Sequence, residues 1–304
     1  MYYEENDYNN SFIWWSNAAN QGDEIAQFNL GALYDNGEGV NQDYSQAIKW
    51  FKKSAEHRFA EALNRLGEMC EEGLGMAQDY DKAFKYYSDA TNLAVVKKSI
   101  DSMVHLGLLY EKGLGTEMDI DEAYMYFEWA AREGHPFAIG KIGYSYLNGI
   151  FYKKDTKRGL KLILKAAEKG DIRATRFLVV LFASGHIVKQ NYDKAKEYFN
   201  KLPNEKHGDT YNEIAWTLHE KGRYDEALPW AEKAVTAYPN DPDIIDTLAT
   251  VYQGLKRYEE ALEKYELCLK LLKEQEGQKK RLMETEEKIA ALKEMMKNGG
   301  ISEQ

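Results

Sequence analysis

Apolar residues near the start of the chain recur with the period of an α-helix, in two segments that a glycine-containing stretch separates. In 24–36 the residues Ala26, Leu30 and Leu33 fall at offsets of 0, 4 and 7, which is one face of a helix. In 44–57 small and aromatic residues fall at offsets of 0, 3, 4, 7 and 8. The stretch between the segments is short, so the pattern predicts two antiparallel helices that form a hairpin.

This hairpin pattern repeats along most of the sequence. Gly31 recurs as Gly67, Gly107 and Gly143, at intervals of 36, 40 and 36 residues. A fixed period in this range is the mark of a repeat array. One hairpin cannot cover its own apolar face, whereas stacked hairpins can. The sequence therefore predicts an all-α fold, an α-α superhelix or right-handed solenoid of antiparallel helix hairpins, with no β-sheet.

The recurring glycine lies inside the first helix of each hairpin. Glycine there costs about 1 kcal/mol relative to alanine, so something must offset the cost in every copy. We expect a steric reason: without a Cβ atom, the aromatic residues of the partner helix can approach closely. The fifth copy has Val179 at this position, which predicts looser or differently angled packing there.

The pattern Ala-x-x-x-Leu-Gly-x-x-Tyr-x-x-Gly-x-Gly, followed by Asp-Tyr-x-x-Ala and an aromatic pair, resembles Sel1-like repeats. The units after about residue 204 are shorter and resemble tetratricopeptide repeats. About four extra residues in 91–98 predict that one second helix is longer by a turn. The expected organisation is a half-repeat or cap helix at 1–23, five Sel1-like repeats at 24–203, two tetratricopeptide-like repeats at 204–275, and a capping helix and tail at 276–304, in one continuous solenoid.

Composition narrows the class of protein. The chain has 304 residues, a formal net charge of −10 and 30% charged residues. Such an acidic chain lacks the basic stripe of a nucleic-acid binder. No apolar run reaches the length of a membrane span, and no signal peptide precedes the repeats, so we expect no membrane insertion and a cytoplasmic protein, or one whose leader has been trimmed. Cys70 and Cys268 are expected to be reduced packing residues.

The sequence offers no candidate for catalysis, a cofactor or a metal. The recurring Gly-x-Gly pairs lack the strand and the Gly-Lys-Ser/Thr ending of a phosphate loop, so they are expected to be turns. No His-x-x-x-His or Cys-x-x-Cys spacing is present. His105, beside the apolar Leu106, is expected to be buried and neutral. We therefore predict that the protein is not an enzyme.

A partner is expected on the first helix of each hairpin, which in solenoids of this kind lines the inner, concave surface. This groove would be acidic in its first half, then basic, then aromatic at Trp216, and an aromatic residue with nearby charge is typical of a binding hot spot. The residues expected to contact a partner are Phe28, Asp35, Asn64, Glu68, Glu71, Leu108, Glu111, Tyr144, Arg173, Arg176, Asn212, Trp216 and His219.

The resemblance implies a non-enzymatic scaffold or adaptor that binds a peptide or a partner protein along this groove. Two alternatives stay open at this point. The protein could be an envelope-associated regulatory or accessory protein, as some members of the family are. It could also assemble with itself, as a homo-oligomer through its terminal helices.

Overall fold

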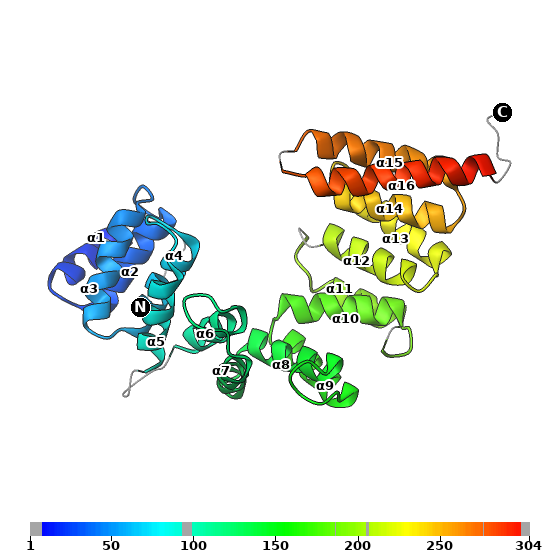
Figure 1. The fold of residues 1–304 in the computed structure, drawn as a ribbon. Coiled ribbons are helices and arrows are strands. Elements are labelled where there is room, and N and C mark those ends of the chain that lie inside the picture. The colour runs from blue at the N-terminus through cyan, green and yellow to red at the C-terminus, as the bar shows by residue number, and fades with distance from the viewer. Residues whose placement is uncertain (1–7, 93–98, 186, 205–206, 276, 299–304) are drawn as a thin grey trace. The chain divides into compact units, whose positions relative to one another are not determined.

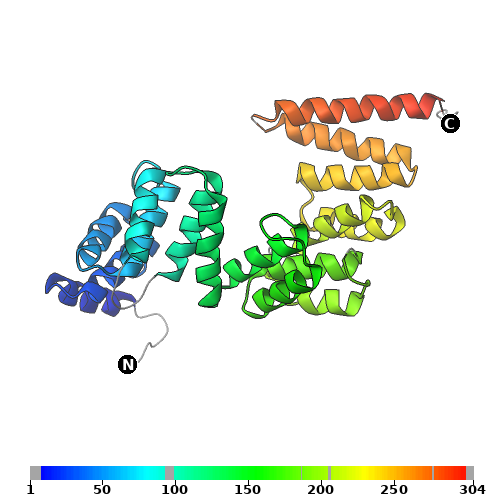
Figure 2. The same cartoon turned by 60° about the horizontal axis from the view of Figure 1, so that its bottom comes forward.

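The computed structural model describes residues 8–92, 99–185, 187–204, 207–275 and 277–298, and in them the chain forms sixteen α-helices and no strand (Figures 1 and 2). The helices are α1 (Tyr8–Asn20), α2 (Glu24–Asn36), α3 (Tyr44–Glu56), α4 (Ala60–Glu72), α5 (Tyr80–Thr91), α6 (Ile100–Lys112), α7 (Ile120–Arg132), α8 (Pro136–Asn148), α9 (Thr156–Glu168), α10 (Ile172–Ser184), α11 (Tyr192–Phe199), α12 (His207–His219), α13 (Tyr224–Ala237), α14 (Pro242–Gly254), α15 (Tyr258–Lys273) and α16 (Lys279–Asn298).

The chain divides into two compact units, Met1–Lys169 with α1 to α9 and Gly170–Gln304 with α10 to α16. In each unit the two helices of a hairpin pack on each other, and hairpins that follow one another in the sequence also pack together. The predicted all-α fold of successive helix hairpins is confirmed. A single solenoid that runs through both units stays a prediction.

Each hairpin is delimited by the same two caps. At the start of α3 the Asp43 carboxylate accepts a hydrogen bond from the backbone N–H of Gln46, which satisfies one of the helix's free donors. At the end of α2, Gly37 adopts a left-handed conformation (φ 74°) and its N–H donates to the carbonyl of Leu33. The later second helices begin after Asp79, Asp119, Asp155 and Asn191, and the later first helices end at Gly73, Gly113, Gly149 and Gly185.

The glycine inside each first helix is where the hairpin closes. A Cβ atom added at Gly67 would lie 2.5 Å from the ring of Tyr87, and one added at Gly107 would lie 2.6 Å from the ring of Phe127. Both distances are shorter than Cβ contacts in folded proteins allow. The prediction that the glycine admits an aromatic residue of the partner helix is confirmed.

The fifth copy solves the same problem in another way. Val179 replaces the glycine and is buried, so it fills the space that an aromatic ring takes elsewhere. The aromatic residue at the matching place, Phe199, instead stacks on Tyr211 of the next hairpin at 5.0 Å between ring centroids. The second helix, α11, has eight residues where α3, α7 and α9 have thirteen. The sequence departure at Val179 therefore coincides with different packing.

The extra helical turn predicted for 91–98 is wrong as far as the structure describes it. Helix α5 ends at Thr91, and the N–H of Asn92 donates to the carbonyl of Ser88 to close it. Residues 93–98 lie outside the described residues. The extra residues therefore follow the helix and do not lengthen it.

In the second unit, α16 packs on α15 and also contacts α14. Leu292 of α16 is fully buried, and the Lys288 ammonium lies 2.7 and 2.8 Å from the two carboxylate oxygens of Asp246. Cys70 in the first unit and Cys268 in the second are buried and unpaired, as predicted.

Candidate functional site

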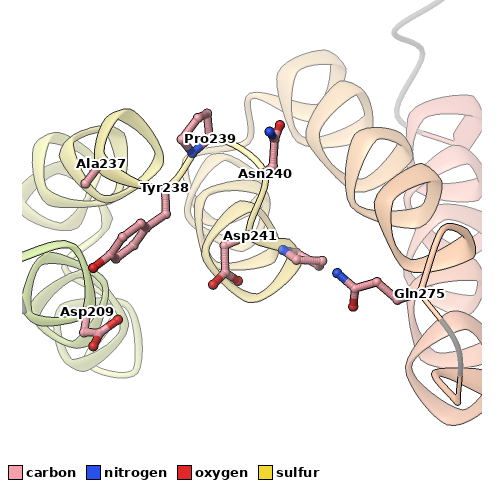
Figure 3. A pocket seen from close by; sticks show the side chains of 8 residues that line it. Asp209, Ala237, Tyr238, Pro239, Asn240, Asp241 and Gln275 are labelled. Atoms are coloured by element: carbon pink, nitrogen blue, oxygen red, sulfur yellow. The ribbon is translucent and has the colours of Figure 1, made fainter. Parts of the chain in front are cut away.

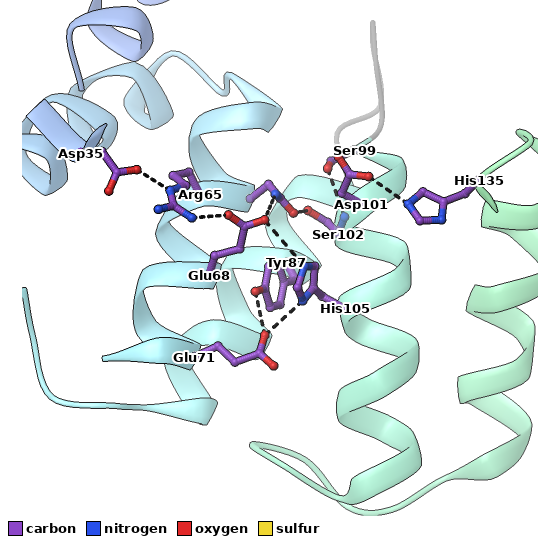
Figure 4. A network of polar contacts seen from close by, with 11 residues as sticks. Asp35, Arg65, Glu68, Glu71, Tyr87, Ser99, Asp101, Ser102, His105 and His135 are labelled. Atoms are coloured by element: carbon purple, nitrogen blue, oxygen red, sulfur yellow. Dashed lines mark hydrogen bonds and ion pairs between the residues drawn. The ribbon is translucent and has the colours of Figure 1, made fainter. Parts of the chain in front are cut away.

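The first helices of the first unit are joined by ion pairs that run between neighbouring hairpins (Figure 4). Arg65 of α4 donates from Nε to Asp35 of α2 at 2.6 Å and from Nη1 to Glu68 at 2.7 Å. Asp35 is 6% exposed, so its charge depends on this cation. Burial works to lower the pKa of Arg65, but the hydrogen bonds and charges of Asp35 and Glu68 raise it above its ordinary value.

His105 of α6 continues the network. Its ring stacks on Tyr87 at 4.6 Å, while Nδ1 lies 3.1 Å from Glu71 and Nε2 lies 3.7 Å from Glu68. Burial lowers the pKa of His105, but the hydrogen bonds to the two carboxylates outweigh burial and raise the pKa to about 9. The expectation of a neutral His105 is therefore wrong, because its neighbours across the repeat boundary are acidic.

A rule of spacing describes these contacts. A cation two residues before the helix glycine of one repeat binds the carboxylate four residues after the helix glycine of the preceding repeat. We call the three contacts of this kind the charge ladder: Asp35 with Arg65, Glu71 with His105, and Glu111 with Lys141 at 2.7 Å. The cations escaped sequence reasoning, which considered each repeat alone. Their constant distance from the glycine was the signal.

The charge ladder changes the electrostatics expected of the groove. Each of the four carboxylates predicted there contacts a cation, so the surface is close to neutral and not strongly acidic. The hydrogen bond to His105 lowers the pKa of Glu71 in spite of burial. A protonated histidine between ionised carboxylates is not a general base, and ionised carboxylates are not general acids at neutral pH. The geometry holds neighbouring hairpins together and supplies no catalytic group.

The remaining predicted residues of this unit are largely used in packing. Asn64 is buried, and its amide donates to Glu68 at 2.8 Å while its oxygen accepts from Ser102 at 2.7 Å. Phe28 contacts two aromatic rings at 5.3 and 5.5 Å between centroids. Leu108 is half-buried in the core between hairpins, and Tyr144 on α8 is half-buried.

In the second unit the predicted residues lie on α10 and α12, which pack directly on each other. Arg173 is exposed, and Arg176 lies 3.0 Å from Glu213 of α12. Trp216 of α12 keeps 42% of its surface exposed and stacks on His219 at 5.2 Å. Burial lowers the pKa of His219, so the ring beneath the indole is neutral at pH 7.

Trp216 stands on a single exposed stripe of α12. The half-buried Asn212 and His219 lie on the same helix face, at offsets of −4 and +3 from the indole. An aromatic side chain that is partly buried on one flank and open on the other has the form of a binding anchor. We call Trp216, its flanking residues Asn212 and His219, and the two arginines Arg173 and Arg176 the Trp216 face.

A pocket of about 480 Å³ opens where α13 meets α14 (Figure 3). It is lined by Asp209 of α12, by the turn from Ala237 to Pro242, and by Gln275. The Asp241 carboxylate there accepts hydrogen bonds from the N–H groups of Asp243 and Ile244, so it caps α14. The lining contains no histidine, cysteine or lysine, and it offers neither a nucleophile nor a base.

Across the described ranges, no group of three or more His, Cys, Asp and Glu side chains is placed to hold a metal ion. In the same residues no helix combines the length and the apolar character that crossing a membrane requires.

The family model described as Sel1 repeat matches residues 3–23, 25–58, 60–94, 100–135, 136–171 and 180–202. Models described as tetratricopeptide repeat match residues 208–238 and 244–280. No curated protein matched the sequence. The family expected from the motifs is thus confirmed, and the tetratricopeptide repeats follow the Sel1 repeats in the expected order.

Several solved structures are similar to this chain. A Sel1 repeat protein from Oxalobacter formigenes is 30% identical, with a TM-score of 0.59 over 64% of this chain and 78% of that one. The protective antigen c5321 of uropathogenic Escherichia coli is 23% identical, with a TM-score of 0.65 over 86% and 57%. Yeast Tom70 is 16% identical, with a TM-score of 0.54 over 95% and 59%. The last two show the fold alone.

Proposed function

The chain belongs to the Sel1 repeat family and continues into tetratricopeptide repeats, and from this premise we propose that it is a non-enzymatic scaffold that binds a segment of another protein on the Trp216 face. Proteins built from these repeats are generally protein-interaction scaffolds and typically lack catalytic activity. In the described residues, the partly buried histidine of the first unit is committed to ion pairs.

The observation that carries the proposal is the exposure of Trp216 on a first helix. Among the predicted groove residues of the first unit, the charged ones are engaged with neighbouring hairpins and the apolar ones pack in the core. Trp216 instead presents 42% of a large aromatic surface to solvent. Tryptophan is among the residues that contribute most to binding when a partner covers them.

The charges near Trp216 suggest what the partner presents. Arg173 is exposed, and Arg176 shares its charge with Glu213. We propose that a bound segment places an apolar side chain on the indole and a carboxylate near Arg173. The charge pair would set orientation and association rate more than affinity, because exposed ion pairs contribute little to stability.

The experiment is affinity capture with the full chain as bait, followed by mass spectrometry. The matched pair of variants is Trp216→Ala and Trp129→Ala, since Trp129 on the second helix α7 is 39% exposed. We expect the same partners on the wild-type chain and on Trp129→Ala, and their loss on Trp216→Ala. Partners that remain bound to Trp216→Ala in wild-type amounts would refute the assignment of the site.

A further inference from the structure

Helix α1 carries an exposed apolar stripe at one end of the first unit. Ile13 is 56% exposed and Trp14 is 74% exposed, and Asn10 and Asn17 extend the exposed face by one turn on either side. The opposite face packs inward, where Ala19 is buried against the hairpin of α2 and α3. The helix is therefore half-covered, with its largest aromatic residue on the open side.

The repeat register shows that this position is normally buried. Trp14 lies 36 residues before Trp50, which occupies the same place in α3. Trp50 is 8% exposed because it packs against Ala19, Ala26 and Leu30 of the preceding hairpin. A tryptophan at this place in the stack is therefore suited to contact another helical surface.

The rim of the stripe differs from its counterparts in the array. The residues of α3 that correspond to Ile13 and Asn17 are Lys49 and Lys53, which are typical of a solvated face. Helix α1 contains no charged residue in its thirteen positions, whereas each of the other fifteen helices of the described residues contains at least one. In a chain with 30% charged residues, this absence marks a surface that avoids charge.

We propose that a second copy of this chain covers the stripe, so that two α1 helices pack about a two-fold axis near Trp14. In such an interface each surface meets its own copy, so its side chains must be able to pair with themselves. Tryptophan, isoleucine and asparagine satisfy this condition, because an amide both donates and accepts hydrogen bonds. Like charges do not, and the remaining surface of a chain with net charge −10 opposes self-association.

The dimer is weak by this account. Two tryptophans and two isoleucines with their rims bury less than about 1,200 Å² in total, which is the lower end of specific interfaces. Self-association is therefore expected in the range of roughly 10 to 300 micromolar, as for other small interfaces. A partner of this strength would form where the chain is concentrated or tethered.

The test is sedimentation velocity of the full chain across that concentration range. The wild-type chain is expected to shift from monomer to dimer, and Trp14→Glu is expected to remain monomeric because two carboxylates would meet near the axis. Ile150→Glu is the matched control, since Ile150 is 69% exposed in a loop of the same unit and gains the same charge. The control is expected to dimerise like the wild-type chain.

A charge-swap experiment tests the symmetry. Trp14→Glu and Trp14→Lys are each expected to be monomeric alone, and their equimolar mixture is expected to form a heterodimer. A wild-type chain that stays monomeric throughout, a Trp14→Glu variant that associates like the wild type, or a mixture that fails to associate would each overturn the proposal. Circular dichroism confirms that each variant is folded, which the exposure of Trp14 leads us to expect.

Discussion

The contact of His105 with Glu68 and Glu71 predicts that the first unit loses stability at mildly alkaline pH. The ordinary pKa of 6.5 rises to about 9 in the folded chain, because the two carboxylates outweigh the opposing effect of burial. Each pKa unit corresponds to about 1.4 kcal/mol, so the full shift corresponds to roughly 3 kcal/mol. The imidazole is 27% exposed, so screening reduces our expectation to about 2 kcal/mol.

The sign follows from which state binds the proton more tightly. Because the folded pKa is the higher one, the stabilisation is fully present below pH 6.5 and is lost as the pH rises through about 9. In the variant His105→Gln this loss should be absent, and the free energy of unfolding at pH 6.5 should be lower by about 2 kcal/mol. The exposed His57 provides the matched control His57→Gln, which should keep the wild-type pH dependence.

The assay must report the first unit alone. Samples equilibrated in urea at pH 6.5 and at pH 9.5 are pulse-labelled with deuterium, and peptides from α4 to α6 are read by mass spectrometry. We expect the wild-type chain to lose about 2 kcal/mol more than His105→Gln between the two pH values. Equal losses in both proteins, or a wild-type chain that gains stability at pH 9.5, would refute the reasoning.

Other predictions concern the same hairpins and use urea unfolding as the measurement. Arg65→Met should cost about 3 kcal/mol because it leaves the buried carboxylate of Asp35 without its cation, and adding Asp35→Asn should recover much of the loss. Lys141→Met should cost less than about 1 kcal/mol, since both groups of its ion pair are about a quarter exposed; equal costs for the two variants would contradict the role assigned to burial. Gly107→Ala should destabilise by about 1 to 3 kcal/mol despite the better helix propensity of alanine, and a double-mutant cycle with Phe127→Leu should show coupling of about 1 kcal/mol or more.

The sequence was sufficient for the hairpins because the signals that define them are local. Helical periodicity predicted the helices, and α2 begins at Glu24 and ends at Asn36 as expected. The glycine at the helix crossing predicted an aromatic partner, since few other reasons make glycine recur inside a helix. Even the exception at Val179 was readable, and the structure shows Phe199 turned to the next hairpin.

The contacts between repeats were harder to predict because they join residues about 30 positions apart. Each carboxylate of the charge ladder, considered alone, resembles a solvated surface group. Only the pairing of Arg65 with Asp35, repeated by Lys141 with Glu111, shows that the groups face each other. The charge of His105 depends on carboxylates from the neighbouring hairpin, so its own sequence neighbours gave the wrong protonation state.

The extra residues after Thr91 show a different limit. Their number, close to one helical turn, fitted a longer helix equally well as a longer connection. Periodicity alone does not distinguish these cases, because helix ends depend on capping contacts that are specific to each site. The residues of the Trp216 face, by contrast, were all named from repeat position, and the structure places them on the packed helices α10 and α12.

The most direct test of the proposed function is calorimetric titration of a captured partner segment into the full chain. Wild-type protein and Trp129→Ala should bind with the same affinity. Trp216→Ala should bind at least about 30-fold more weakly, which corresponds to the loss of one hot-spot residue of about 2 kcal/mol. Equal affinities for the wild-type chain and Trp216→Ala would contradict the claim that this face is where the scaffold holds its partner.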